Sequence, residues 1–273
     1  MSSSDAHEAH AMILACLKWV THPGEPHDER FAGISPADQS ALEFALVQAA
    51  ALGLGVTAVT VGPAGAEKVL RDALACGAQR AVRIHSAGTL SSAEVADALA
   101  AAAPAARWVW CGDYSLDRGT GSVPAYLAAA LDAQQALGVI SVAWQGDGVV
   151  ATRRLDGGRR ELLSVAAPAV ISVEGATAHL RRAGLGALRA AASATIDVVH
   201  PAAPAHTDEA VVRAYRPRAR ALAAPLGEQP LDRLRALAAT GAATATRVET
   251  VTLAPPAAAA RIAAALREWG YLD

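Results

Sequence analysis

Four apolar runs, each followed by a helix-forming segment, constrain the fold of this chain more than any other feature. The runs occupy residues 11–20, 56–61, 80–85 and 107–111, and the helical segments residues 36–52, 64–76, 91–102 and 123–131. The run at 56–61 has no polar face, as expected of a strand covered on both sides. Such alternation with short connections predicts an α/β fold with three layers and a doubly wound, mostly parallel sheet. Sheets of this kind bind ligands at the carboxyl ends of the strands, where the strand order reverses.

The first helical segment has clear start and stop signals. Ser35 stands at the N-cap position, Pro36 at the first helical position and Asp38 in the first turn. Gly53 and Gly55 follow the last periodic residue and predict the end of the helix near residue 52.

A glycine-containing loop follows the fourth apolar run and leads into a helix. Gly119 and Gly121 allow a close backbone approach, while Thr120 and Ser122 offer hydroxyl groups. With Ser122 as N-cap, the positive end of the helix would point at the same place. The loop therefore predicts either an anion cradle for a nucleotide or an ordinary connection between strand and helix.

The pattern changes after residue 138. Short strands without intervening helices are predicted at 138–144, 149–155, 159–165 and 169–173, with a hairpin turn at Asp156-Gly157-Gly158. These strands predict an antiparallel edge to the parallel sheet. We expect a main domain over residues 1–200 and a C-terminal extension over 201–273, since 201–254 is proline-punctuated and poor in large apolar residues. A last helix begins at Pro255 and ends near Gly270, with Ile262, Leu266 and Trp269 along one face.

Composition excludes several classes of function. The net charge of −2 and pI near 6.4 give no electrostatic case for nucleic acid or an acidic membrane surface. No run reaches the ~20 strongly apolar residues of a membrane span, and a cytoplasmic protein is expected. The three cysteines lie far apart in apolar settings and are interpreted as reduced core residues. We expect no metal site in the polar loop that contains His22, His27, Asp28 and Glu29, because its prolines and glycine leave no rigid frame for ligands.

The hairpin region carries a specific family resemblance. Residues 151–163 (ATRRLDGGRRELL), followed by Pro168-Ala-Val-Ile-Ser, resemble the signature of the β subunits of electron transfer flavoproteins, which include the FixA proteins. Residues 14–20 resemble the first strand of the family, and Ser35-Pro-Ala-Asp resembles its Asn-Pro helix start. Asp117-Arg-Gly-Thr-Gly-Ser also fits, and the resemblance covers about residues 11–199.

The resemblance implies a heterodimer with an α/β fold of the adenine nucleotide hydrolase type. In this family the α subunit holds most of a redox-active FAD, while the β subunit covers that FAD and binds a structural AMP. By matching position, the residues expected to line the adenosine are Cys16, Ser35, Pro36, Ala37, Asp38 and Val61. Those expected to hold the phosphate are Asp117, Arg118, Gly119, Thr120, Gly121 and Ser122.

The family also docks partner dehydrogenases through an exposed leucine on a loop, and Leu185 stands at that position here. The resemblance therefore implies two partners: an α subunit, which the C-terminal extension contacts, and a dehydrogenase that donates electrons. It is also compatible with a quinone-linked protein as the downstream electron acceptor. The chain departs from the family pattern at Gly112-Asp113-Tyr114, where Gly-Lys-Gln is usual, and at Ala37, where an aromatic residue can stand. These departures indicate a divergent branch.

Functions from other classes were weighed beside this one. A Rossmann dehydrogenase would need G-x-G-x-x-G after the first strand, where the sequence has Lys18-Trp-Val-Thr-His-Pro, and a kinase or ATPase would need a Walker loop, which is missing. A hydrolase would need a nucleophile with its base, but Ser115 and Cys111 have no G-x-S-x-G context and no evident histidine partner. Two alternatives stay open: a non-redox adenine-nucleotide-binding protein resembling universal stress proteins, and a bifurcating form with a second FAD in place of AMP. An electron-transfer role requires no catalytic acid, base or nucleophile in this chain, because the flavin does the chemistry.

Overall fold

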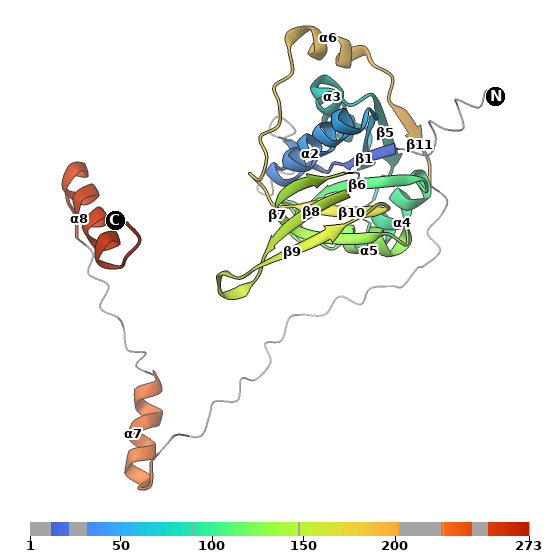
Figure 1. Cartoon of the computed structure of the whole chain (residues 1–273). Coiled ribbons are helices and arrows are strands. Elements are labelled where there is room, and N and C mark those ends of the chain that lie inside the picture. The colour runs from blue at the N-terminus through green and yellow to red at the C-terminus, as the bar shows by residue number, and fades with distance from the viewer. Residues whose placement is uncertain are drawn as a thin grey trace. The chain divides into compact units, whose positions relative to one another are not determined.

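A nine-stranded sheet organises the first part of the chain (Figure 1). The computed structural model describes residues 12–21, 32–88, 90–146, 148–201, 225, 227–241 and 251–272. In sheet order the strands are β11 (Asp197–Val199), β5 (Arg80–His85), β4 (Val56–Gly62), β1 (Met12–Cys16), β6 (Ala106–Gly112), β10 (Ala169–Val173), β7 (Gln134–Gln145), β8 (Gly148–Arg154) and β9 (Arg160–Val165). The strands from β11 to β7 pair in parallel, and β7, β8 and β9 pair antiparallel. The predicted mostly parallel sheet with an antiparallel edge is confirmed.

Helices cover both faces of the sheet (Figure 1). On one face lie α2 (Pro36–Leu52) and α3 (Glu67–Cys76), which follows a 3₁₀ turn, η2 (Ala64–Ala66). On the other lie α4 (Ser92–Ala102) and α5 (Val123–Ala130). Successive side chains of a strand point to opposite faces of the sheet, and β6 follows this alternation. Trp108 and Trp110 pack in the core on the first face, and Val109 packs in the core on the second face. Trp110 donates to Gln48 Oε1 of α2 at 2.8 Å, so its buried indole N–H is satisfied.

The helix boundaries follow the signals in the sequence. Ser35 caps α2 by accepting from the backbone N–H of Asp38 at 3.3 Å, and Gly53 ends α2 at φ 66°. Ser91 and Glu94 form a capping box at the start of α4. Both predicted helix starts are confirmed.

The predicted strand over residues 11–20 is wrong in its second half. β1 ends at Cys16, and the backbone N–H of Lys18 donates to Asp38 Oδ2 at 2.9 Å instead of continuing a ladder. β2 (Trp19–Val20) then pairs antiparallel with β3 (Gly33–Ile34) in a separate two-stranded sheet. The buried carboxylate of Asp38 thus terminates β1, which an apolar pattern could not reveal.

Two strands take places that the sequence did not predict. β10 was expected among the antiparallel strands, but it lies between β6 and β7 and is parallel to both. β7 begins at Gln134 rather than at residue 138, so its first part extends the parallel layer and its second part starts the hairpins. The turn η3 (Asp156–Gly158) joins β8 to β9, as predicted. The edge strand β11 was not predicted.

The segment between β10 and β11 includes α6 (Leu185–Ser193), which is anchored at both ends. Before α6, the Arg181 guanidinium forms an ion pair with Glu43 of α2 at 2.8 Å. At the end of α6, Arg71 of α3 donates to the carbonyl groups of Ala191 and Ala192, both at 2.9 Å. These contacts fix the helix that begins with Leu185.

The chain separates into two compact units, Met1–Asp208 and Glu209–Asp273. In the second unit the described elements are α7 (Pro230–Gly241) and α8 (Pro255–Glu268). α8 matches the predicted last helix, and its Ile262 and the following Trp269 are 61% and 69% exposed. α7 was not predicted, although Leu231 and Leu234 recur at helical spacing. Among the described helices, none has the length and apolar character that crossing a bilayer requires.

Candidate functional site

A cavity of about 330 Å³ lies at the carboxyl ends of β1, β4 and β6. The chain adds β4 and β5 on one side of β1 and then crosses to place β6 on the other side, so the strand order reverses here. Cys16, Val61 and Cys111 line the cavity from these three strands. Its volume is at the lower end of the ~300–1,000 Å³ that small-molecule sites occupy.

Asp38 joins the strand ends that frame the cavity. Its carboxylate accepts from the backbone N–H of Lys18, just after β1, at 2.9 Å and from that of Gly112, at the end of β6, at 3.1 Å. Burial raises the pKa of Asp38 from its ordinary value of 3.8 to about 7, against the opposing effect of these hydrogen bonds. The approach is so close that a Cβ on Gly112 would stand 2.4 Å from Asp38 Oδ1. Only glycine fits there.

The loop between β6 and α5 forms the second side of the cavity. Gly119 and Gly121 have φ angles of 61° and 59°, in the left-handed region that favours glycine. A Cβ on Gly121 would lie 2.4 Å from the carbonyl oxygen of Asp113, so this position also excludes a side chain. The loop thus turns its backbone tightly at the mouth of the cavity.

The two helix N-termini beside the cavity differ in chemistry. At the start of α4, the backbone N–H of Glu94 donates to the Ser91 side chain and the backbone N–H of Ser91 donates to the Glu94 carboxylate. This capping box places a negative charge at the N-terminus of α4. At the start of α5, Ser122 holds the predicted N-cap position, but its side chain makes no capping hydrogen bond, and no acidic residue stands in the first turn. The start of α5 therefore has neither a side-chain cap nor an acidic side chain to offset its helix dipole, whereas the start of α4 has both.

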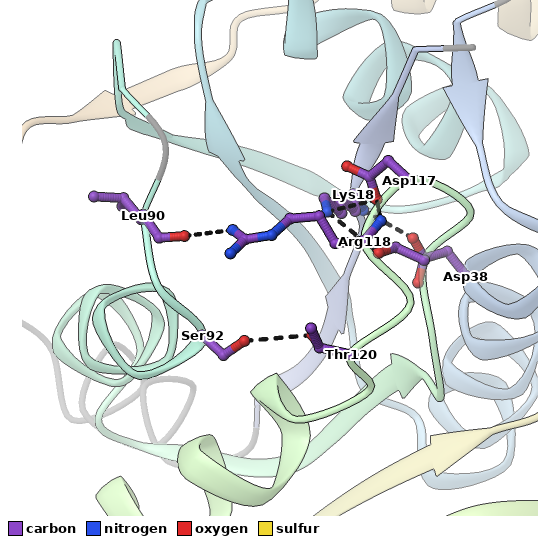
Figure 2. A network of polar contacts seen from close by, with 8 residues as sticks. Lys18, Asp38, Leu90, Ser92, Asp117, Arg118 and Thr120 are labelled. Carbon is purple, nitrogen blue, oxygen red and sulfur yellow. Dashed lines mark hydrogen bonds and ion pairs between the residues drawn. The ribbon is translucent and has the colours of Figure 1, made fainter. Parts of the chain in front are cut away.

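Charged side chains line the mouth of the cavity (Figure 2). Lys18 Nζ pairs with Asp117 Oδ1 at 2.7 Å, and the Arg118 guanidinium donates to the carbonyl oxygen of Leu90 at 2.6 Å. Ser92 Oγ and Thr120 Oγ1 are 3.4 Å apart. Burial acts to raise the pKa of Asp117, but hydrogen bonds from Lys18, Ser115 and the Arg118 backbone outweigh it and lower that pKa. Asp117 is therefore an anion that orders the loop.

The structure brings together most of the residues that the sequence nominated. Eight of them line the cavity: Cys16, Asp38, Val61, Asp117, Arg118, Thr120, Gly121 and Ser122. Four do not line it: Ser35 is the buried cap of α2, Pro36 and Ala37 begin that helix, and the N–H of Gly119 donates to the Ser115 carbonyl oxygen at 2.9 Å. Leu185 lies elsewhere, as the first residue of α6 rather than on a loop, and is 66% exposed.

Sequence reasoning missed one wall of the cavity. Ser86, Gly88, Leu90 and Ser92 line it from the connection between β5 and α4. The available signal was topological, because the connection after β5 must emerge at the same edge as those after β1, β4 and β6. Lys18, Tyr114 and Ser115 also line the cavity and were not nominated.

All three cysteines carry free thiols, and none belongs to a metal cluster: the described residues hold no group of three or more candidate ligands. The predicted polar loop with His22, His27, Asp28 and Glu29 lies outside the described residues.

Fold and cavity together define a doubly wound α/β protein with a ligand-sized cavity at the switch point of its sheet. Residues 27–204 match the electron transfer flavoprotein domain, and the chain belongs to that family. It is 32% identical to an electron transfer flavoprotein subunit beta of Thermoanaerobacterium thermosaccharolyticum over 51% of this chain and 55% of that protein. It is 33% identical to the protein FixA of Rhizobium meliloti over 58% of each chain. A FixA protein of Bradyrhizobium diazoefficiens is 30% identical over 74% of this chain and 78% of its own length.

Proposed function

We propose that this chain is the β subunit of a heterodimeric electron transfer flavoprotein and holds AMP in the cavity. Its relatives of the same family are named electron transfer flavoprotein subunit beta and FixA, although the chain spans little more than half the length of the first two. In the complex it would cover an FAD held mainly by the α subunit, and that flavin would supply the electron-carrying chemistry. The chain itself contributes binding and docking, with no catalytic group assigned to it.

The observation that carries the AMP proposal is the uncapped N-terminus of α5 at the cavity mouth. No side chain caps its first turn, in which Val123 and Ala125 carry backbone N–H groups and Pro124 has none, and two glycines with positive φ lie in the loop before it. Such a start favours a phosphate group, because both the N–H groups and the helix dipole attract an anion. Arg118 belongs to the loop before α5, where its guanidinium donates to the Leu90 carbonyl oxygen (Figure 2), and it would give a bound phosphate a charge-assisted hydrogen bond.

The remaining cavity wall suits a nucleoside. Val61, Val95 and Leu99 supply apolar surface, and Cys16 and Asp38 stand at the strand ends opposite the loop. The start of α2 does not line the cavity, so we assign Ser35, Pro36 and Ala37 the role of positioning Asp38 rather than contact with the adenosine. The volume of about 330 Å³ favours a mononucleotide over a second FAD, the ligand of a bifurcating form.

We further propose that Leu185 docks a dehydrogenase and that α7 and α8 contact the α subunit. Leu185 is exposed on a helix held by arginine contacts at both ends, which presents an apolar anchor on a fixed support. The exposed apolar residues of α8 are of the kind that a partner surface covers.

Titration of the nucleotide-free chain with AMP tests the site. Arg118→Gln is expected to weaken AMP binding at least tenfold, since a hydrogen bond to a charged group contributes about 1.5–3 kcal/mol. The control is Arg107→Gln, the same change at an exposed position near the other end of β6. AMP binding that is unchanged in Arg118→Gln, or absent in the parent chain, would refute the proposed site.

A non-redox nucleotide-binding protein remains the rival function. Co-expression with an electron transfer flavoprotein α subunit separates the two: a yellow heterodimer supports the flavoprotein, and a colourless homodimer supports the rival.

A further inference from the structure

Two cysteines that are 95 positions apart in sequence lie opposite each other at the floor of the cavity. Cys16 ends β1, Cys111 precedes the last residue of β6, and the parallel register of these neighbouring strands pairs them directly. Because neighbouring strands lie about 4.8 Å apart, paired residues fall within the ~4.4–6.8 Å Cα separation that disulfides require.

Both side chains point to the same face of the sheet. Cys111 belongs to the apolar cluster beneath α4 and α5, and Cys16 packs against that cluster. The interaction with Cys16 is the largest cause of the raised pKa of the Cys111 thiol, in keeping with this pairing. The third cysteine, Cys76, ends α3 on the opposite face of the sheet, where its thiol donates to the Arg181 carbonyl oxygen at 3.4 Å. Cys16 and Cys111 are therefore a pair from which Cys76 is separated by the sheet.

We propose that Cys16 and Cys111 form an oxidisable dithiol that a peroxide entering the cavity converts into a disulfide. Neither an AMP site nor a flavin is needed for this reaction. Cys16 is the partly exposed member and Cys111 the buried one, which assigns the first attack to Cys16 and the resolving step to Cys111.

The reaction balances with hydrogen peroxide as the oxidant. Cys16 Sγ attacks one peroxide oxygen, the O–O bond breaks, Cys16 becomes a sulfenic acid, and the released hydroxide takes the thiol proton to form water. Cys111 Sγ then attacks Cys16 Sγ, the S–O bond breaks, and the hydroxyl group leaves with the Cys111 proton as a second water. The dithiol loses two electrons, and the peroxide gains them.

The environment of Cys111 predicts a slow resolving step at neutral pH. The interaction with Cys16, burial and the charge of Asp38 raise the pKa of the Cys111 thiol, so the resolving thiol is protonated at neutral pH. The rate of crosslinking is expected to increase as the pH rises, because only the thiolate is nucleophilic.

Peroxide treatment of the reduced full chain tests the pair. The expected result is a fall from three titratable thiols to one, with a non-reduced peptide map that links the β1 peptide to the β6 peptide and with reversal by dithiothreitol. Cys76→Ser should retain the crosslink, whereas Cys16→Ser and Cys111→Ser should each abolish it. A crosslink that contains Cys76, or Cys16 oxidised to sulfinic acid without a crosslink, would overturn the proposal.

A second arm, which rests on the proposed function, asks whether the cavity ligand protects the thiols. Saturating AMP is expected to slow crosslinking, because an occupied cavity shields Cys16 from peroxide. An unchanged rate in a chain that demonstrably binds AMP would contradict the shielding and leave the AMP site itself intact.

Discussion

Replacing Asp38 with asparagine gives the sharpest quantitative test of how the cavity is framed. The side chain is 6% exposed and accepts two backbone N–H groups from the ends of two strands. Burial raises its pKa from 3.8 to about 7, so the folded chain binds the Asp38 proton more tightly than the unfolded chain does. The free energy of unfolding should therefore fall as the pH rises from about 4 to about 7.

The size of this effect follows from the rise in pKa. At about 1.4 kcal/mol per pH unit, ionisation of Asp38 costs the fold about 4 kcal/mol by pH 8. Asparagine does not titrate, but its NH2 group only donates, so it can accept just one of the two backbone N–H groups that the two Asp38 oxygens accept. Asp38→Asn should thus be less stable than the parent at pH 4, because it loses one accepted hydrogen bond, and should gain about 4 kcal/mol relative to the parent between pH 4 and pH 8.

Urea unfolding of both proteins between pH 4 and pH 8, followed by tryptophan fluorescence, measures the difference. Trp108 and Trp110 are suitable reporters because both are buried in the core of the same unit. Asp97→Asn, at an exposed position of α4, controls for loss of an acidic residue. A difference between parent and Asp38→Asn that does not change with pH, or that favours the parent as the pH rises, would refute the reasoning.

Two further variants test the loop and the docking residue. Gly121→Ala should abolish AMP binding and destabilise the loop by more than ~1–2 kcal/mol, because a left-handed φ of 59° is strained for alanine and its Cβ would lie 2.4 Å from the Asp113 carbonyl oxygen. Isothermal titration and thermal melting would detect these effects. Tight AMP binding by the variant would contradict the prediction. Leu185→Ala should slow electron transfer from the partner dehydrogenase at least tenfold and leave the melting temperature unchanged, since the side chain is 66% exposed. The control is Val47→Ala, on the surface of α2. Equal rates of electron transfer for both variants would show that Leu185 is not part of the docking site.

Local signals in the sequence were sufficient for much of the fold. The cap at Ser35 and the stop at Gly53 depend on neighbouring residues only, and the structure confirms them. The alternation of strands and helices placed the carboxyl ends of β1, β4 and β6 at one edge, where the cavity lies. Residues of the loop before α5 could be nominated because glycine and hydroxyl residues precede a helix.

Features that depend on tertiary contacts were not predicted. β1 ends at Cys16 because Asp38, 22 positions later, takes the Lys18 N–H, and no local pattern reports that contact. β10 joins the parallel layer without a preceding helix, so the rule that links parallel strands to helical crossovers misplaced it. The pairing of Cys16 with Cys111 likewise depends on strand register, which spacing in the sequence does not reveal.

The nucleotide content of the native complex tests the central claim most directly. The chain is co-expressed with its α subunit, the heterodimer is denatured, and the released nucleotides are separated and quantified. The account predicts FAD and AMP in equal amounts, with less AMP when Arg118 is replaced by glutamine and the same amount of FAD. Release of FAD alone, or of two FAD molecules per heterodimer without AMP, would contradict it.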